Sequence, residues 1–88
     1  MQLIDLIFAA SDERAQGFIA ASFANLDRKR KAGTYCPTRA LALLRNNAAD
    51  LSKAYCRAIG WYDRLAFKAD MLDAIAARLL AQWSQSNG

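Results

Sequence analysis

Two aspartates in the C-terminal third of the chain have a spacing that suits metal-ion chemistry. Asp70 and Asp73 are three residues apart in a stretch of helix-forming residues. On a helix this spacing turns both carboxylates to the same side, and carboxylate oxygens are ligands that magnesium accepts. The alternative is that both are surface aspartates near a helix start, where the helix dipole stabilises negative charge.

The segment KADMLDAI around this pair resembles one half of the signature of the all-α nucleotide pyrophosphatases. In that family two helices contribute acidic clusters that hold magnesium and a triphosphate, so the resemblance implies a magnesium-dependent enzyme. The second acidic cluster is missing, because the preceding predicted helix offers Asp50 alone. We keep this enzyme as a third alternative and expect no catalytic residues, no metal site and no cofactor.

Other reactive residue types are scarce. The chain has no histidine, and its two cysteines, Cys36 and Cys56, do not form a CxxC motif. The lack of histidine removes the commonest general base and every Ser-His or Cys-His pair. A zinc site would depend on carboxylates for most of its ligands, which structural zinc sites rarely use. The N-terminus lacks the features of a signal peptide, so we expect a cytoplasmic protein with free thiols. Because reactive residue types are scarce, we also expect no small-molecule substrate.

The 12 basic and 8 acidic residues give a net charge of +4, which favours an anionic partner. Basic residues of the first two predicted helices are expected to merge into one patch that contacts phosphates or an acidic protein. The patch consists of Arg28, Lys29, Arg30, Lys31, Arg39, Lys53 and Arg57. The cluster 28–31 also has a structural explanation, since cations in a last helical turn followed by Gly33 form a helix stop.

Residues 54–72 carry some features of a helix-turn-helix, with a glycine at the turn and a small residue in the second helix. In such a motif Tyr62, Arg64 and Lys68 would meet DNA, because residues near the start of the recognition helix reach the base edges. Trp61 stands where a small apolar residue is usual, and the second helix is apolar where it should face DNA. Nucleic-acid binding is therefore the alternative to protein binding.

Composition and periodicity predict an all-α fold. Hydrophobic residues make up 55% of the 88 residues, Gly and Pro are few, and valine is absent, a balance that favours helix over sheet. No apolar run reaches the roughly 20 residues of a membrane span. We predict an antiparallel three-helix bundle that forms one domain over 1–84, followed by a frayed polar tail at 85–88. The predicted helices are 2–31, 38–59 and 63–84.

The helix ends follow from local signals. The apolar phase of the first segment survives across Ser11, which predicts one continuous helix, with two shorter helices capped near Ser11 as the alternative. A row of small residues that includes Gly17 would admit a close neighbouring helix, unless Gly17 simply weakens its own helix. Thr38 is the predicted N-cap of the second helix, and Gly60 is predicted to end it.

The third predicted helix has apolar residues on two faces. One face is a core seam of Leu65, Ala69, Leu72, Ala76, Leu79 and Trp83. A three-helix bundle cannot easily cover both faces. We therefore predict an apolar partner-binding surface, which would also allow a homodimer through the third helix. This surface consists of Trp61, Tyr62, Phe67, Met71, Ala74 and Arg78. The alternative is that the first helix buries Phe67 and Met71.

These features together predict a small non-enzymatic interaction module, an adaptor or inhibitor that covers an acidic surface of a larger protein. A short, basic chain without catalytic motifs is also typical of phage or mobile-element accessory proteins.

Overall fold

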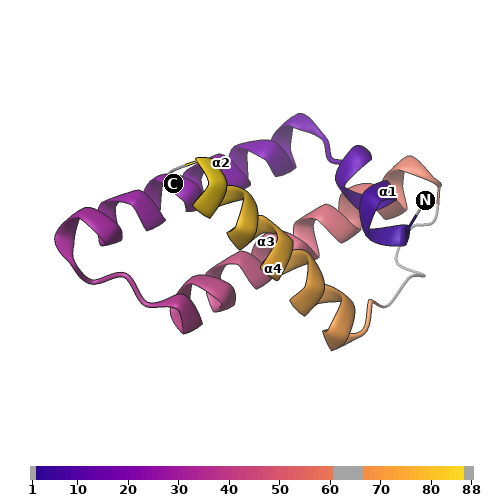
Figure 1. Cartoon of the computed structure of the whole chain (residues 1–88). Coiled ribbons are helices and arrows are strands. Elements are labelled where there is room, and N and C mark those ends of the chain that lie inside the picture. Colours follow the sequence, from indigo (N-terminus) through magenta and orange to yellow (C-terminus); the bar gives the residue numbers. More distant parts are fainter. Residues whose placement is uncertain (1, 61–66, 87–88) are drawn as a thin grey trace.

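In a computed structural model, which describes residues 2–60 and 67–86, the chain is helical and has four helices (Figure 1). They are α1 (Leu3–Ala9), α2 (Glu13–Ala32), α3 (Pro37–Ala58) and α4 (Ala69–Ser86). The predicted all-α class is confirmed, whereas the predicted number of three helices is wrong for the described residues. None of these helices is long and apolar enough to cross a membrane.

The predicted helix 2–31 is in fact two helices. The Asp12 carboxylate accepts a hydrogen bond of 2.8 Å from the backbone N–H of Ala15 and so caps α2. The Ser11 hydroxyl donates to the carbonyl of Phe8, at 2.9 Å, where α1 ends. Side-chain hydrogen bonds of this kind compete with helical backbone bonds. Here they end one helix and start the next, although the spacing of apolar residues continues across the break. The cap is Asp12, one residue after the position considered from sequence.

The turn between α2 and α3 follows the predicted stop closely, but α3 starts earlier than expected. Gly33 has a φ of 74°, in the left-handed region that favours glycine, and its N–H donates to the carbonyl of Arg30. Helix α3 begins at Pro37 with Cys36 as its N-cap, so the predicted cap Thr38 is wrong. Proline suits the first helical position because its missing N–H would have no helical partner there.

The observed α4 begins later in the sequence than the third helix that was predicted. Helix α4 starts at Ala69, after Phe67 and Lys68, and continues to Ser86, beyond the predicted end at residue 84. The predicted start at 63, together with Trp61, Tyr62 and Leu65, lies outside the described residues. Lys68 provides the carbonyl that accepts the backbone N–H groups of Met71 and Leu72 in the first turn.

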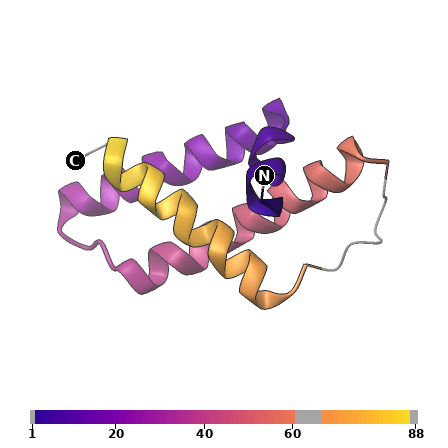
Figure 2. The ribbon, with the colours of Figure 1, turned by 45° about the vertical axis from the view of Figure 1, so that its right-hand side comes forward.

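Helices α2 and α3 form an antiparallel pair, and α4 crosses α3 so that its C-terminal end reaches the C-terminal half of α2 (Figures 1 and 2). Two contacts define the register of the pair. The Asn47 amide donates to the Ser22 hydroxyl at 2.8 Å, and Arg57 contacts Asp12 at 2.7 Å. From Ser22 to Asp12 the chain of α2 is followed ten residues backward, and from Asn47 to Arg57 the chain of α3 is followed ten residues forward, as expected for antiparallel helices.

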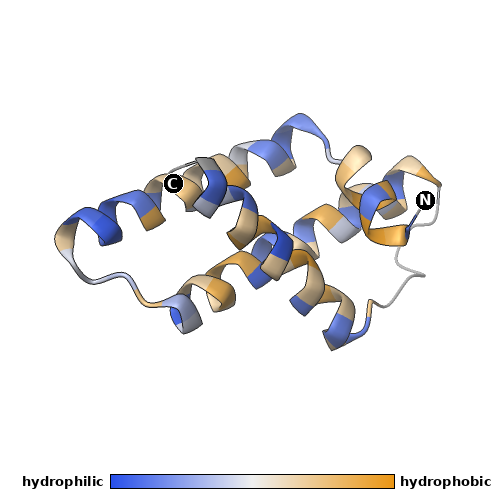
Figure 3. Ribbon diagram, viewed as in Figure 1, coloured by the Kyte–Doolittle hydropathy of each residue, from blue (hydrophilic) through white to orange (hydrophobic). Residues whose placement is uncertain are grey.

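The core lies where α4 crosses the α2–α3 pair, with α1 closing one end. Figure 3 shows apolar and polar residues alternating along the helices, as expected for helices with one buried side. From the predicted seam of the third helix, Ala76, Leu79 and Trp83 are buried, Leu72 is half-buried and Ala69 is exposed. The fully buried large side chains are Ile7, Leu26, Leu44, Leu51, Ile75 and Leu79.

The small-residue row of the first segment does not receive a neighbouring helix. Gly17 is exposed, and a Cβ added there would meet no atom of the described residues within 4 Å. Its remaining effect is the weakening of α2 that a glycine causes in a helix interior.

Candidate interaction surface

The antiparallel pairing of α2 and α3 separates the predicted basic patch into two groups. Residues 28–31, at the end of α2, lie beside Arg39, in the first turn of α3. Lys53 and Arg57 lie toward the other end of α3, near the start of α2. The 14 residues from Arg39 to Lys53 span about 21 Å of helix. A single merged patch at one end of the bundle is therefore not what the fold produces.

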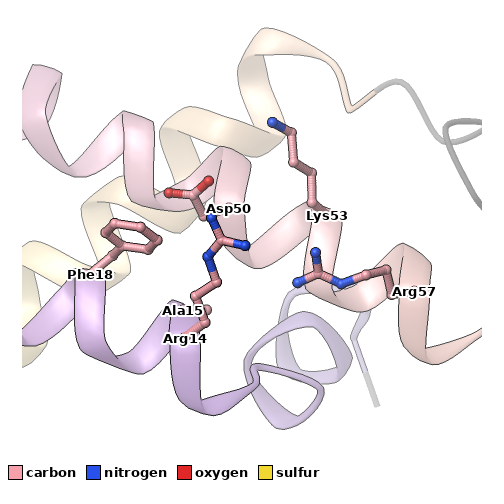
Figure 4. A pocket seen from close by; sticks show the side chains of 6 residues that line it. All are labelled: Arg14, Ala15, Phe18, Asp50, Lys53 and Arg57. Atoms are coloured by element: carbon pink, nitrogen blue, oxygen red, sulfur yellow. The ribbon is translucent and has the colours of Figure 1, made fainter.

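At the start of α2, a third cation joins Lys53 and Arg57. Arg14 lines a hollow of about 280 Å³ with these two residues and with Ala15, Phe18 and Asp50 (Figure 4). The Phe18 ring is 46% exposed, and the Arg14 guanidinium carbon lies 5.8 Å from its centroid. A cation placed over an aromatic ring is attracted by the electrons of the ring. This end of the surface therefore combines positive charge with an accessible apolar ring.

A second hollow, of about 130 Å³, lies at the turn between α2 and α3, where Lys29 and Arg39 contribute to its lining. Cys36 also lines it, and the backbone N–H groups of Arg39 and Thr38 lower the pKa of its thiol below the ordinary value. Neighbouring Tyr35 packs on Trp83, with ring centroids 5.2 Å apart. The tyrosine ring is thus engaged with α4.

The larger hollow lies on the side of the α2–α3 pair that faces away from α4. Lys29, eleven residues from Phe18, and Arg39, eleven residues from Asp50, each lie within about 20° of that side. Asp27 contacts Trp83 of α4, and Phe18, nine residues earlier, is about 180° around the helix from Asp27. Arg45 contacts Asp73 of α4, and Asp50, five residues later, is about 140° around α3 from Arg45. We call this side the basic face. It consists of Arg14, Phe18, Lys29, Arg39, Asp50, Lys53 and Arg57.

Several acidic groups form ion pairs or hydrogen bonds with other residues of the same chain. Arg78 contacts Asp5 at 2.6 Å and its hydrogen bond lowers the pKa of that carboxyl, while the N–H of Ala15 lowers the pKa of Asp12. The indole N–H of Trp83 donates to Asp27 at 2.9 Å.

By contrast, four cations of the basic face form no ion pair with any described residue. They are Arg14, Lys29, Arg39 and Lys53. Asp5 and Asp73 are paired with arginines outside this face, and among the face's cations Arg57 alone forms an ion pair with a described residue, Asp12. The positive charge of the face therefore comes mainly from these four residues.

The predicted apolar surface of the third helix is largely packed against other elements. Phe67 and Met71 are half-buried against the core, and the Phe67 ring meets Tyr55 edge-on with centroids 6.5 Å apart. Arg78 reaches α1, where its guanidinium lies 4.4 Å from the centroid of the Phe8 ring. Ala74 is exposed. The side chains Trp61 and Tyr62 lie outside the described residues.

Large exposed apolar side chains of the described residues lie elsewhere than on α4. They are Leu3, Leu6, Phe18, Leu41 and Ile59. Phe67 and Met71 are partly buried against the core, and the ring contact of Phe67 is with Tyr55 of α3 and not with the first helix.

Three residues of the basic face are not part of the patch predicted from sequence. They are Arg14, Phe18 and Asp50. The signal that could have identified them is the short turn between the second and third segments. A turn of that length makes the two helices antiparallel neighbours, so the start of α2 must lie beside the end of α3, where Lys53 and Arg57 are found.

Asp73, considered for a metal site, is paired with an arginine, and Lys68, considered for a recognition helix, precedes α4. Asp73 contacts Arg45 at 3.0 Å, and residues 2–60 and 67–86 contain no group of three or more candidate metal ligands. Lys68 precedes α4 and is not part of a recognition helix. Tyr62 and Arg64 fall outside the described ranges.

No protein-family model, no curated protein and no solved structure matches the chain.

Proposed function

We propose that this protein is a non-enzymatic interaction module, an adaptor or inhibitor, that binds an acidic surface of a larger protein through its basic face. The observation that carries this proposal is the collection of cations from two helices on one face, while the acidic groups Asp5 and Asp73 are paired with arginines outside that face. Complementary charge of this kind steers association and selects partners.

The composition of the face favours a protein partner over a nucleic acid. Phe18 is an exposed aromatic ring of the type that anchors protein interfaces. Tyr35, in the basic turn, packs on Trp83, which leaves less of its ring for stacking with a base.

We also propose that the partner is met in the cytoplasm. Both cysteines are free thiols, and Cys56 is buried in the fold. Free thiols persist in a reducing compartment.

The test is cross-linking followed by mass spectrometry in the native cells, comparing the wild-type chain with the variant Lys29→Glu/Arg39→Glu. The matched control is Lys31→Glu/Lys68→Glu, which changes the net charge equally and alters the same kinds of helix end. We expect cross-links to an acidic protein that the first variant loses and the control keeps. Equal cross-linking of both variants, or recovery of nucleic acid in place of protein, would contradict the proposal.

A further inference from the structure

The cations of the basic face are arranged in two groups, with Asn46 and Asp50 between them on α3. Lys29 and Arg39 lie at the turn between α2 and α3, while Arg14 and Lys53 lie near the opposite end of the pair. Asn46 is seven residues from both Arg39 and Lys53, so the three share one side of α3 in the order cation, amide, cation. The two charged groups are separated by about 21 Å along α3.

This spacing corresponds to about four turns of an α-helix. A helix lying along α2 and α3 can reach both charged groups with acidic residues about 14 positions apart, and those residues fall on nearly the same side. At the Arg14–Lys53 end, the hollow of about 280 Å³ is lined by Ala15 and the exposed Phe18 as well as by charged residues, so a side chain that enters it can contact the Phe18 ring. Two antiparallel helices provide ridges and grooves into which a third helix packs.

We propose that the part of the partner bound by the basic face is an acidic amphipathic helix, which lies along α2 and α3. Its acidic side chains meet the two groups of cations, and an apolar side chain enters the hollow beside Phe18. This inference rests on the proposed function and adds the form of the ligand. A nucleic acid fits less well, because its evenly spaced phosphates would meet the neutral Asn46 and the negative Asp50 between the cations.

The probe is a labelled synthetic helical peptide that carries Glu at both ends of one face, about 14 residues apart, and Leu between them. Its control has the same composition and net charge, with the Glu residues distributed around the helix. Binding to the full-length protein is measured by fluorescence anisotropy. We expect the designed peptide to bind at least about tenfold more tightly than the control peptide, equivalent to about 1.4 kcal/mol.

Variants then test each end of the face separately. We expect Lys29→Glu/Arg39→Glu and Arg14→Glu/Lys53→Glu each to weaken binding of the designed peptide by about tenfold or more, because two attractions become repulsions. The matched control Lys31→Glu/Lys68→Glu should bind like the wild type. Circular dichroism verifies folding of each variant, and Lys53→Glu alone replaces the second pair if that pair does not fold.

The outcomes separate this inference from the proposed function. Equal binding of both peptides, or equal loss of binding in the control variant, would show that charge acts without helical geometry and would overturn the inference. Full competition by duplex DNA at equal charge concentration would overturn it as well. If the peptides fail to bind while Lys29→Glu/Arg39→Glu still abolishes the cellular cross-links, the proposed function stands and the helical ligand is wrong. If the peptides fail and the cross-links persist, both are wrong.

Discussion

Trp83 connects three parts of the fold, and its replacement is the strongest test of the packing that holds the α2–α3 pair in place. The side chain is 2% exposed, its indole N–H donates to Asp27 of α2, and its ring packs on Tyr35 of the turn. Arg30 adds a cation 5.6 Å from the centre of the ring. The change Trp83→Ala removes all of these contacts at once.

The expected cost follows from the buried area. A tryptophan buries about 150–250 Å², which at about 25 cal/mol per Å² corresponds to about 4–6 kcal/mol. Alanine retains a small part of this, so we expect Trp83→Ala to lower the free energy of unfolding by about 3–5 kcal/mol. Trp83→Phe keeps an aromatic ring but loses the hydrogen bond to the Asp27 carboxylate, and should cost about 1–3 kcal/mol.

The assay is urea denaturation followed by circular dichroism, with a double-mutant cycle between Trp83→Phe and Asp27→Ala. We expect the two changes to be coupled by about 1 kcal/mol, since they remove the same hydrogen bond. A loss below about 1 kcal/mol for Trp83→Ala, far under the range for aromatic truncation in a core, would refute the packing described here. Additive effects of the two smaller changes would refute the hydrogen bond.

Three further predictions concern the helix ends and the thiols. The pKa of Asp12 is lowered, mainly by a backbone N–H in the first turn of α2. The ionised carboxylate therefore stabilises the fold above the ordinary pKa of 3.8, and this stabilisation disappears as pH falls through the lower pKa of the folded state. Asp12→Ala should lower the urea midpoint at pH 7 and have little effect near pH 2. Gly33→Ala should lower the free energy of unfolding by about 1 kcal/mol because of the positive φ, whereas Gly17→Ala, in the helix interior, should raise it by up to about 1 kcal/mol. Changes in the same direction for both variants, measured by urea denaturation, would argue against the assigned φ values. Iodoacetamide at pH 7.5 should alkylate Cys36, with its lowered pKa, faster than buried Cys56; preferential labelling of Cys56, detected by mass spectrometry, would contradict their placement.

Sequence patterns predicted the helices whose ends carry strong local signals. The stop at Gly33 follows from residue type and spacing, and the structure confirms it. The continuous first helix was preferred to two helices capped near Ser11 because the apolar period continues across the break, while the decisive hydrogen bonds of Ser11 and Asp12 depend on local geometry. The late start of α4 was missed for a related reason, since apolar periodicity extends into residues that precede the helix.

The candidate site depended more on tertiary structure than on sequence. Arg39 and Lys53 were both predicted, but as members of one patch at one end, whereas the antiparallel pair places them about four turns apart. Arg14 and Phe18 join the site through the register that the Ser22–Asn47 contact helps to set. Such a register is decided by long-range packing, which a local pattern does not contain.

The central claim is that the basic face binds an acidic helical segment of another protein. The most direct measurement is a titration of the ¹⁵N-labelled protein with the designed acidic peptide, followed by NMR chemical shifts of backbone amides. We predict that the largest changes fall on α2 near Phe18 and on α3 near Arg39 and Lys53, on the side away from α4. Changes concentrated instead around Ala74 on the exposed side of α4, with the basic face unchanged, would contradict the account.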